Sequence, residues 1–212
     1  MIIGLTGMYC AGKNHVAALL QNQGFSVLDL DALGHSVIEA KKTEIFARFG
    51  EHIRNPDGSV NRRQLGAAIF GRKDELSALE DIVHPEVNRL TEQWIMTQNG
   101  KNRVLNAALL HRSCFFRRLD SIIIVRAPWL IRLIRAKRRD KLPWPALFKR
   151  FSSQKQFNTQ YLAGNADIYR VENSFCRSET KLKRQIDEIL SKAGSVKDRS
   201  ETGKHKTTQG GF

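Results

Sequence analysis

The sequence predicts an α/β fold in which helices pack on a parallel five-stranded sheet. Short apolar runs alternate with longer segments of helical periodicity along the 212 residues. The run IIIV at 122–125 is apolar at every position, as in a strand buried on both faces. We expect strands at 1–6, 26–31, 102–107, 121–127 and 167–172.

The helices follow from the segments between these strands. Val16, Leu19 and Leu20 share one face of a helix over 13–23, and Gly24 ends it. Residues 32–100 are too long for one crossover and predict an inserted helical lobe, interrupted by the turn NPDGSVN. The expected helices are 32–49, 62–70, 74–98, 128–140 and 179–191.

The composition is that of one ordinary globular domain, since 41% of the residues are hydrophobic. No apolar run approaches the roughly 20 residues that cross a bilayer, and no basic leader precedes MIIGLTG, so we expect a cytoplasmic protein without a membrane partner. The three scattered cysteines read as free thiols. The oligomeric state is left open.

The chain is strongly basic, with 35 Lys and Arg against 21 Asp and Glu and a net charge of +14. An anionic partner is therefore expected. Phosphorylated small molecules suit this charge, and no zinc finger or RNA-binding motif favours nucleic acid. The segment 193–212 is polar and basic and is expected to be a disordered tail.

The stretch GMYCAGKN follows the first strand and nearly matches the phosphate-binding pattern G-x-x-x-x-G-K-[ST]. Gly7, Gly12 and Lys13 fit, but Asn14 replaces the hydroxyl residue that usually binds magnesium. Backbone N–H groups of such a loop, here including Cys10 and Ala11, hold phosphates, and the lysine reaches the terminal ones. An Asn oxygen is also a hard ligand, so we expect ATP and Mg²⁺ here with Asn14 as the metal-binding residue.

Two alternatives stay open beside this loop. His15 either contacts a phosphate or faces solvent in the first helical turn. Asp29 and Asp31 lie two apart on the second strand and share a face, so either can supply the carboxylate that accepts a proton from a hydroxyl. Asp31 is nearer the strand end and is the better candidate, whereas Asp29 can instead cap a helix.

Four stretches together resemble the dephospho-CoA kinase family: MIIGLTG with GK, VLDLDALGHSV, DGSVNRRQLGAAIF and LEDIVHPEV. The resemblance runs from Met1 to Lys192. It implies a P-loop NTPase-type three-layer sandwich and ATP-dependent phosphorylation of the ribose 3′-hydroxyl of dephospho-coenzyme A. It also implies a core at 1–31 and 102–192, an acceptor-binding lobe at 32–100 and a basic lid at 136–160.

Site residues follow from the same resemblance. The loop from Gly7 to His15 aligns with the ATP loop, Asp31 with the catalytic base, and His84 with Pro85 with the acceptor side. Arg135 and Arg139 align with lid residues that face the phosphates and are one helical turn apart. Arg150 and Gln154 match a further lid pair, and the matched apolar positions Leu65 and Phe70 are expected in the core.

Two departures from the family pattern mark further positions. AALLHR at 107–112 replaces Pro-Leu-Leu-x-Glu, which places Arg112 on the substrate side. Asn173 is followed by Ser174 instead of glycine and is assigned to the adenine end of the nucleotide site.

Two other functions compete with this one. The chain can be another P-loop nucleoside or nucleotide kinase, or a non-catalytic nucleotide- or RNA-binding descendant in which Asn14 has cost the metal. The joint presence of Lys13, Asp31, Arg135 and Arg139 favours a kinase.

Overall fold

A computed structural model of the chain describes residues 1–98, 102–152, 166–174 and 179–204. It divides into two compact units, Met1–Val27 with Lys101–Phe212 and Leu28–Gly100. The second unit corresponds to the predicted helical lobe within a few residues. In the described part of the chain, no helix has the length and apolar character that crossing a membrane requires.

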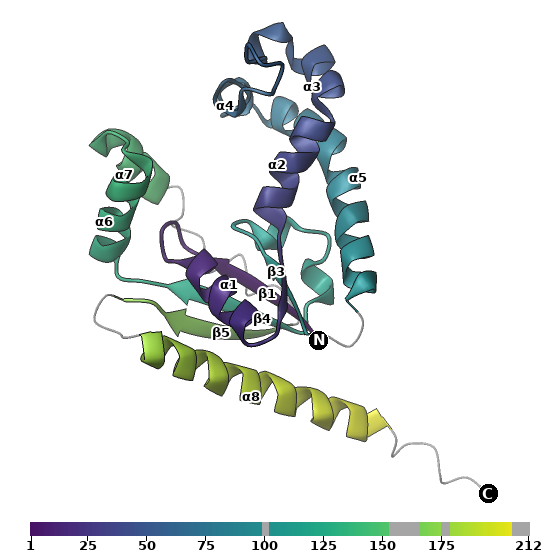
Figure 1. Cartoon of the computed structure of the whole chain (residues 1–212), viewed down its shortest axis with the longest axis vertical. Coiled ribbons are helices and arrows are strands. Elements are labelled where there is room, and N and C mark those ends of the chain that lie inside the picture. The colour runs from purple at the N-terminus through teal and green to yellow at the C-terminus, as the bar shows by residue number, and fades with distance from the viewer. Residues whose placement is uncertain (99–101, 153–165, 175–178, 205–212) are drawn as a thin grey trace, which may run out of the picture. The chain divides into compact units, whose positions relative to one another are not determined.

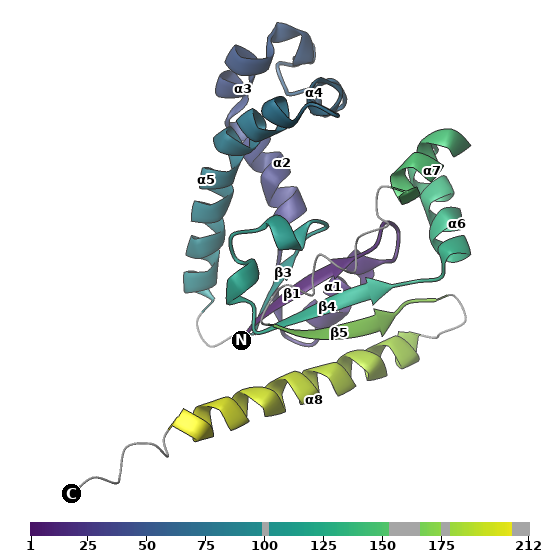
Figure 2. The ribbon, with the colours of Figure 1, turned by 180° about the vertical axis from the view of Figure 1, so that it is seen from behind.

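The sheet has five strands in the order β2-β3-β1-β4-β5, which are β2 (Ser26–Asp29), β3 (Arg103–Asn106), β1 (Ile2–Gly7), β4 (Ser121–Arg126) and β5 (Asp167–Glu172). It is parallel throughout, with Leu5 opposite Asn106 on one side and Ile123 on the other. Figure 2 shows β4 between β1 and β5. The predicted α/β fold is confirmed.

One face of this sheet packs on α1 (Lys13–Asn22) and α8 (Glu179–Lys204), which lie on the same side of it in Figure 1. Buried residues from both helices join those of the strands: Ile3, Leu5, Val16, Leu20, Ile123, Val125 and Ile186. On the opposite face, a Cβ on Gly4 would lie 2.5 Å from Leu110 and 2.7 Å from Leu119. The segment after β3, with η2 (Leu110–Arg112) and η3 (Phe116–Arg118), therefore covers that face closely.

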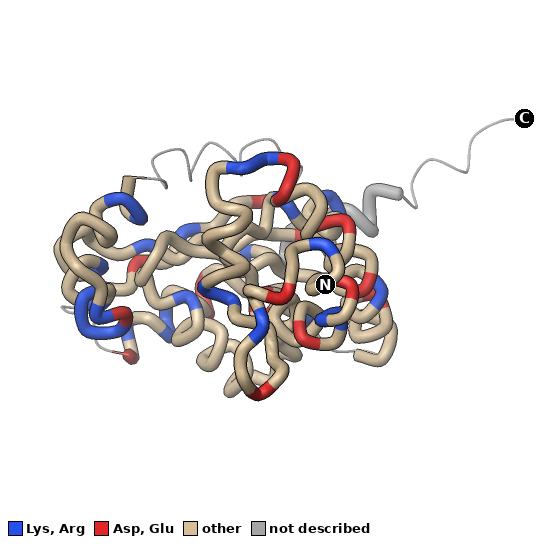
Figure 3. Tube along the Cα trace, turned by 90° about the horizontal axis from the view of Figure 1, so that it is seen from above, with Lys and Arg blue, Asp and Glu red and all other residues tan. Residues whose placement is uncertain are grey.

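Two helices after β4 form the predicted basic region, α6 (Trp129–Asp140) and α7 (Trp144–Ser152). Between residues 129 and 152 there are eight Lys and Arg and one acidic residue, Asp140. Figure 3 shows this basic cluster at the left end of the trace. A small core of Leu133, Ala136, Leu147 and Phe151 joins the two helices.

The second unit is helical, with α2 (Leu30–Ala40), α3 (Lys42–Phe49), η1 (Glu51–Ile53), α4 (Arg62–Ile69) and α5 (Lys73–Thr97). Its own core includes Val37, Ile45, Phe49, Leu65 and Val83. The single helix expected over 32–49 is two helices, because the chain bends at Lys41.

The last helix is longer than predicted. We expected it to end at 191 and a disordered tail to begin at 193, but α8 continues to Lys204. Ala193, which lies beyond the predicted helix end, is only 7% exposed. Residues 205–212 lie outside the described part.

Candidate active site

The loop between β1 and α1 needs glycine at both ends. A Cβ on Gly7 would lie 2.9 Å from the carbonyl oxygen of Val125. Gly12 has φ +94°, which L side chains rarely adopt, and a Cβ there would lie 2.1 Å from Asn173 Nδ2. Between them Cys10 also has a positive φ of 58°, without being glycine. The backbone therefore turns tightly into the N-terminus of α1, the geometry that presents N–H groups to phosphate.

Two distant side chains hold this loop by one carbonyl. The Ala11 oxygen accepts from Arg135 Nη1 at 3.2 Å and from Asn173 Nδ2 at 2.9 Å. Arg135 Nη1 also donates to the Asn173 carbonyl at 3.2 Å. Burial lowers the pKa of Arg135 below its usual range. Arg135 and Asn173 thus come together at the back of the loop, where they fix its shape.

Asn14 faces the end of a neighbouring strand. Its Oδ1 accepts from Nδ2 of Asn106, the last residue of β3, at 3.4 Å. This bond is long, so a cation can compete for the oxygen. Among the described residues, no group of three or more His, Cys, Asp and Glu side chains is arranged to hold a metal ion. One amide oxygen fits Mg²⁺, which keeps several waters and binds phosphate oxygens as well.

Two more predicted residues lie in the first turn of α1. Lys13 is the first residue of the helix and is half-buried. His15 is exposed. An exposed side chain at this position is compatible with both interpretations of His15.

Arg139 lies beside the tip of the loop, held by a carboxylate. Its Nε donates to Asp140 Oδ1 at 2.7 Å, and its guanidinium carbon lies 5.2 Å from the centre of the Tyr9 ring. The bond from Arg139 holds the pKa of the Asp140 carboxyl below its ordinary value and raises that of Arg139. Arg150 Nη1 also binds Asp140, at 3.1 Å. Its expected partner Gln154 lies outside the described residues.

The two aspartates of the second strand do not share a face, contrary to our expectation. β2 ends at Asp29, which is the N-cap of α2 and accepts the N–H groups of Asp31 and Ala32, both at 3.0 Å. Asp31 is exposed in the first turn of that helix. The strand is shorter because Asp29 satisfies the free N–H groups at the helix start. The capping alternative for Asp29 is correct.

Two other residues predicted for the acceptor side lie on a helix of the same unit. His84 and Pro85 are exposed inside α5, not at a helix boundary. Leu65 is 3% exposed, as expected of a core residue, but Phe70 is 69% exposed. The core prediction for Phe70 is wrong because the residue follows the end of α4 in an extended conformation.

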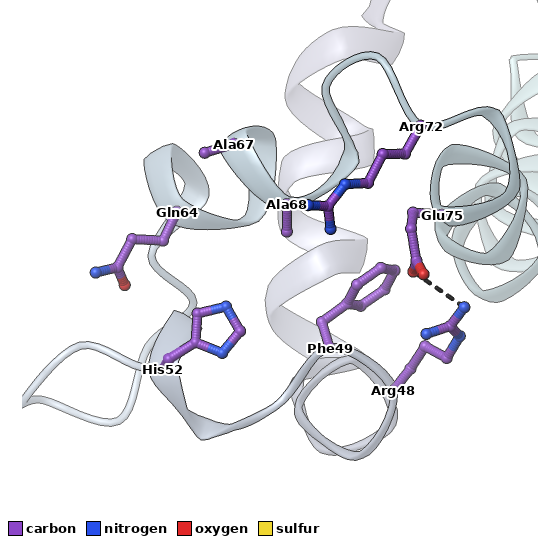
Figure 4. A pocket seen from close by; sticks show the side chains of 8 residues that line it. All are labelled: Arg48, Phe49, His52, Gln64, Ala67, Ala68, Arg72 and Glu75. Carbon is purple, nitrogen blue, oxygen red and sulfur yellow. Dashed lines mark ion pairs between the residues drawn. The ribbon is translucent and has the colours of Figure 1, made fainter.

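This helical unit has a pocket of about 430 Å³ that the sequence did not indicate. Figure 4 shows its lining, in which Arg72 and the Phe49 ring lie near Ala68. Arg48 Nη2 and Glu75 form an ion pair of 2.9 Å on one side. The remaining lining residues are His52, Gln64 and Ala67.

Arg112 and Cys10 are two further residues of the first unit that the sequence singled out. Arg112 ends η2 and is exposed. Cys10 is half-buried, and burial raises the pKa of its thiol, which disfavours the reactive thiolate form. Cys10 packs beside the core of α6 and α7 and reads as a loop filler. Cys114 is exposed, and Cys176 lies outside the described residues.

Comparison with known proteins decides the family. The family model described as dephospho-CoA kinase matches residues 1–191. The chain belongs to the dephospho-CoA kinase family. A dephospho-CoA kinase of Treponema denticola is 32% identical over 205 residues, covering 92% of this chain and 91% of the relative. The enzyme of Shouchella clausii is 33% identical and covers 91% of this chain and 98% of its own length. Members of this family are kinases that use ATP as the nucleotide substrate.

Solved structures agree with this placement. The crystal structure of TT1252 from Thermus thermophilus has a TM-score of 0.77 and 30% identity, and covers 91% of this chain and 97% of its own. The dephospho-CoA kinase of Campylobacter jejuni has a TM-score of 0.64 at 20% identity, covering 92% and 98%, and shows the shared fold. The kinase prediction drawn from the sequence is confirmed.

Three residues in or near the loop and the helices α6 and α7 were not singled out from the sequence. Asn106 is a polar residue that follows the apolar residues Val104 and Leu105 at the end of β3, a signal that the sequence did contain. Tyr9 occupies a loop position where the phosphate-binding pattern allows any residue. Arg132 is only 8% exposed, and its Nε and Nη1 have no hydrogen-bond partner in the described chain. Nothing in the sequence distinguishes Arg132 from its exposed neighbours on α6.

Proposed function

We propose that this chain transfers the γ-phosphoryl group of ATP to the 3′-hydroxyl of the ribose of dephospho-coenzyme A, giving coenzyme A and ADP. Relatives named dephospho-CoA kinase are similar to this chain over about nine-tenths of its length. The observation that carries the proposal is the loop from Gly7 to Gly12, whose carbonyl at Ala11 is held by Arg135 and Asn173. A loop fixed in this way presents its N–H groups to phosphate without further rearrangement.

On the donor side, the loop N–H groups and Lys13 hold the phosphates. Arg139 supplies positive charge beside them, which offsets the charge that spreads over the transferred group. Arg135 contributes a second charge while it supports the loop. Asn173 follows β5, donates to the Ala11 carbonyl of the loop, and is proposed to bind the nucleoside end of ATP. His15 stays a lesser candidate for phosphate contact because it faces solvent.

The metal proposed here is Mg²⁺, held by Asn14 Oδ1. When bound, it shields the phosphate charges and orients the nucleotide. Asn106 donates to the same oxygen and therefore orients the Asn14 side chain. Mg²⁺ keeps a coordination shell of water and phosphate oxygens, so one protein oxygen is enough.

On the acceptor side, Asp31 accepts the proton of the ribose hydroxyl as that oxygen attacks phosphorus. Asp29 fixes the start of the helix that carries Asp31, because its carboxylate holds the N–H group of Asp31 itself. His84 and Pro85 bind the acceptor from α5, and Arg112 binds its negatively charged part. The basic helices α6 and α7 exclude water from the phosphates, which limits hydrolysis of ATP. We expect the enzyme to act in the cytoplasm.

A panel of acceptors tests this proposal. ADP release is measured with dephospho-coenzyme A, nucleosides and nucleoside monophosphates at equal concentration. We expect release with dephospho-coenzyme A to exceed that with the others by at least about a hundredfold, the discrimination that paired polar contacts supply. Preference for a nucleoside would assign the chain to another kinase class. ATP binding without release for any acceptor would indicate a non-catalytic descendant.

A further inference from the structure

Tyr9 lies at the tip of the phosphate-binding loop, between Gly7 and Gly12, and its ring packs against both basic helices. The Phe151 ring of α7 meets it edge to face, with centroids 5.4 Å apart. The guanidinium carbons of Arg139 on α6 and Arg150 on α7 lie 5.2 and 5.7 Å from the ring centre. One aromatic side chain of the loop therefore contacts three residues from two helices.

The hydroxyl group of Tyr9 forms hydrogen bonds with charged side chains around the ring. It donates to the Asp140 carboxylate and accepts from Arg150 Nη1 at 3.2 Å. The same carboxylate accepts from Arg139 Nε at 2.7 Å and from Arg150 Nη1 at 3.1 Å. The carboxylate side chain is 15% exposed, so these bonds are largely shielded from water. Tyr9 and Asp140 thus bind both arginines together.

This arrangement matters because the surrounding charge is one-sided. Asp140 is the one acidic residue against eight Lys and Arg between residues 129 and 152. Like charges repel, so Arg139 and Arg150 would separate and point into solvent without a shared counter-ion. The carboxylate keeps them together, and the Tyr9 hydroxyl fixes the carboxylate to the phosphate-binding loop.

We propose that Tyr9 is a positioning residue for ATP, which acts through Asp140 to hold Arg139 and Arg150 beside the phosphate-binding loop. Tyr9 touches neither the acceptor nor the reacting atoms in this assignment. A site whose arginines are already in place loses less conformational entropy when it binds ATP. The expected effects on kinetics rest on the proposed function, whereas the expected effects on ATP affinity require only that the chain binds ATP.

The test compares Tyr9→Phe, which keeps the ring, with Tyr9→Ala, which removes both ring and hydroxyl. Tyr169→Phe is the matched control, because Tyr169 lies on β5 outside this cluster. We expect Tyr9→Phe to weaken ATP binding about fivefold, the effect of one hydrogen bond, and Tyr9→Ala to weaken it about thirtyfold. The KM for the acceptor should stay within about twofold of the wild-type value, a split that a general structural defect would not produce.

A double-mutant cycle shows whether Tyr9 acts through Asp140. If it does, Tyr9→Phe in an Asp140→Asn background has little further effect on the dissociation constant for ATP. Fully additive effects, or wild-type ATP affinity in Tyr9→Ala, would overturn the inference. Calorimetric ATP binding is measured without acceptor. A failure of the proposed function would therefore appear separately, as ATP binding without acceptor-dependent ADP release.

Discussion

Asn14 Oδ1 and Asn106 Nδ2 lie 3.4 Å apart, so the residue that breaks the usual phosphate-loop pattern contacts the carboxyl end of β3. The contact orients an amide oxygen where a hydroxyl is normal. We expect this oriented oxygen to serve the loop in place of the usual hydroxyl.

Asn14→Leu removes the oxygen while nearly keeping the side-chain volume. We expect the Mg²⁺ concentration for half-maximal activity to rise at least about tenfold, because the metal loses its protein ligand. Asn14→Ser restores an oxygen and should stay near the wild-type requirement. The measurement is ADP release at fixed ATP over a Mg²⁺ titration. An unchanged requirement in Asn14→Leu would remove Asn14 from the metal site.

Asp31→Asn keeps the size of the side chain and removes the proton acceptor. We expect kcat to fall at least about a hundredfold, the usual contribution of a general base, with ATP affinity unchanged. Asp29→Asn is the matched control, because asparagine caps helices as well as aspartate does and should leave activity intact. Steady-state kinetics with calorimetric ATP binding separate the two effects. Normal turnover in Asp31→Asn would refute the assignment of the base.

Arg132 is a buried cation, and few interactions offset the desolvation of its guanidinium group. Its guanidinium carbon lies 4.9 Å from the centre of the Phe151 ring, but its Nε and Nη1 have no hydrogen-bond partner in the described chain. Arg132→Met is expected to raise the free energy of unfolding by about 1 to 3 kcal/mol, since an apolar side chain of similar length avoids the desolvation penalty. Urea unfolding measures this difference, and the exposed Arg138→Met should show almost none. A marked loss of stability in Arg132→Met would mean that the buried charge is compensated.

The Asp140 cluster predicts a pH dependence of stability. The bond from Arg139 holds the pKa of the Asp140 carboxyl below its ordinary value of 3.8. The unfolded chain therefore takes up this proton first, so the stabilisation is complete above about pH 4 and is lost as the pH falls further. We expect Asp140→Asn to lower the free energy of unfolding by about 2 kcal/mol near pH 6.

The difference between wild type and Asp140→Asn should shrink as the pH is lowered from 6 to 3. Thermal or urea unfolding at each pH measures it. Asp81→Asn on α5 is exposed and serves as the control. A difference that stayed constant over this range would show that the carboxylate charge does not stabilise the fold.

The strands were predictable because a parallel sheet buries them on both faces, so Ile122 to Val125 had to be apolar. The ends of the helices were harder to predict. The chain spacing of Asp29 and Asp31 suits a strand as well as a helix start, and the hydrogen bond from the Asp31 N–H to Asp29 decides between them. Likewise, α8 extends to Lys204 through residues whose polarity alone resembles a disordered tail.

The site was predictable at positions that require one residue type. It was less predictable where residues far apart in the sequence contact one another. Gly12 has a positive φ and lies so close to Asn173 that no side chain fits. This glycine of the phosphate-binding motif could therefore be recognised from the sequence. The bond of Arg135 to Ala11 joins residues 124 positions apart, and no local pattern contains it. The same holds for Tyr9 and Asp140, which are 131 positions apart.

The most direct test of the central claim follows the phosphoryl group itself. The chain is incubated with ATP labelled in the γ-phosphate, Mg²⁺ and dephospho-coenzyme A, and the products are separated and their masses measured. The label is expected on the ribose 3′-oxygen of newly formed coenzyme A, with none transferred by Lys13→Ala. Label released only as inorganic phosphate, or retained in ATP, would contradict the proposed function.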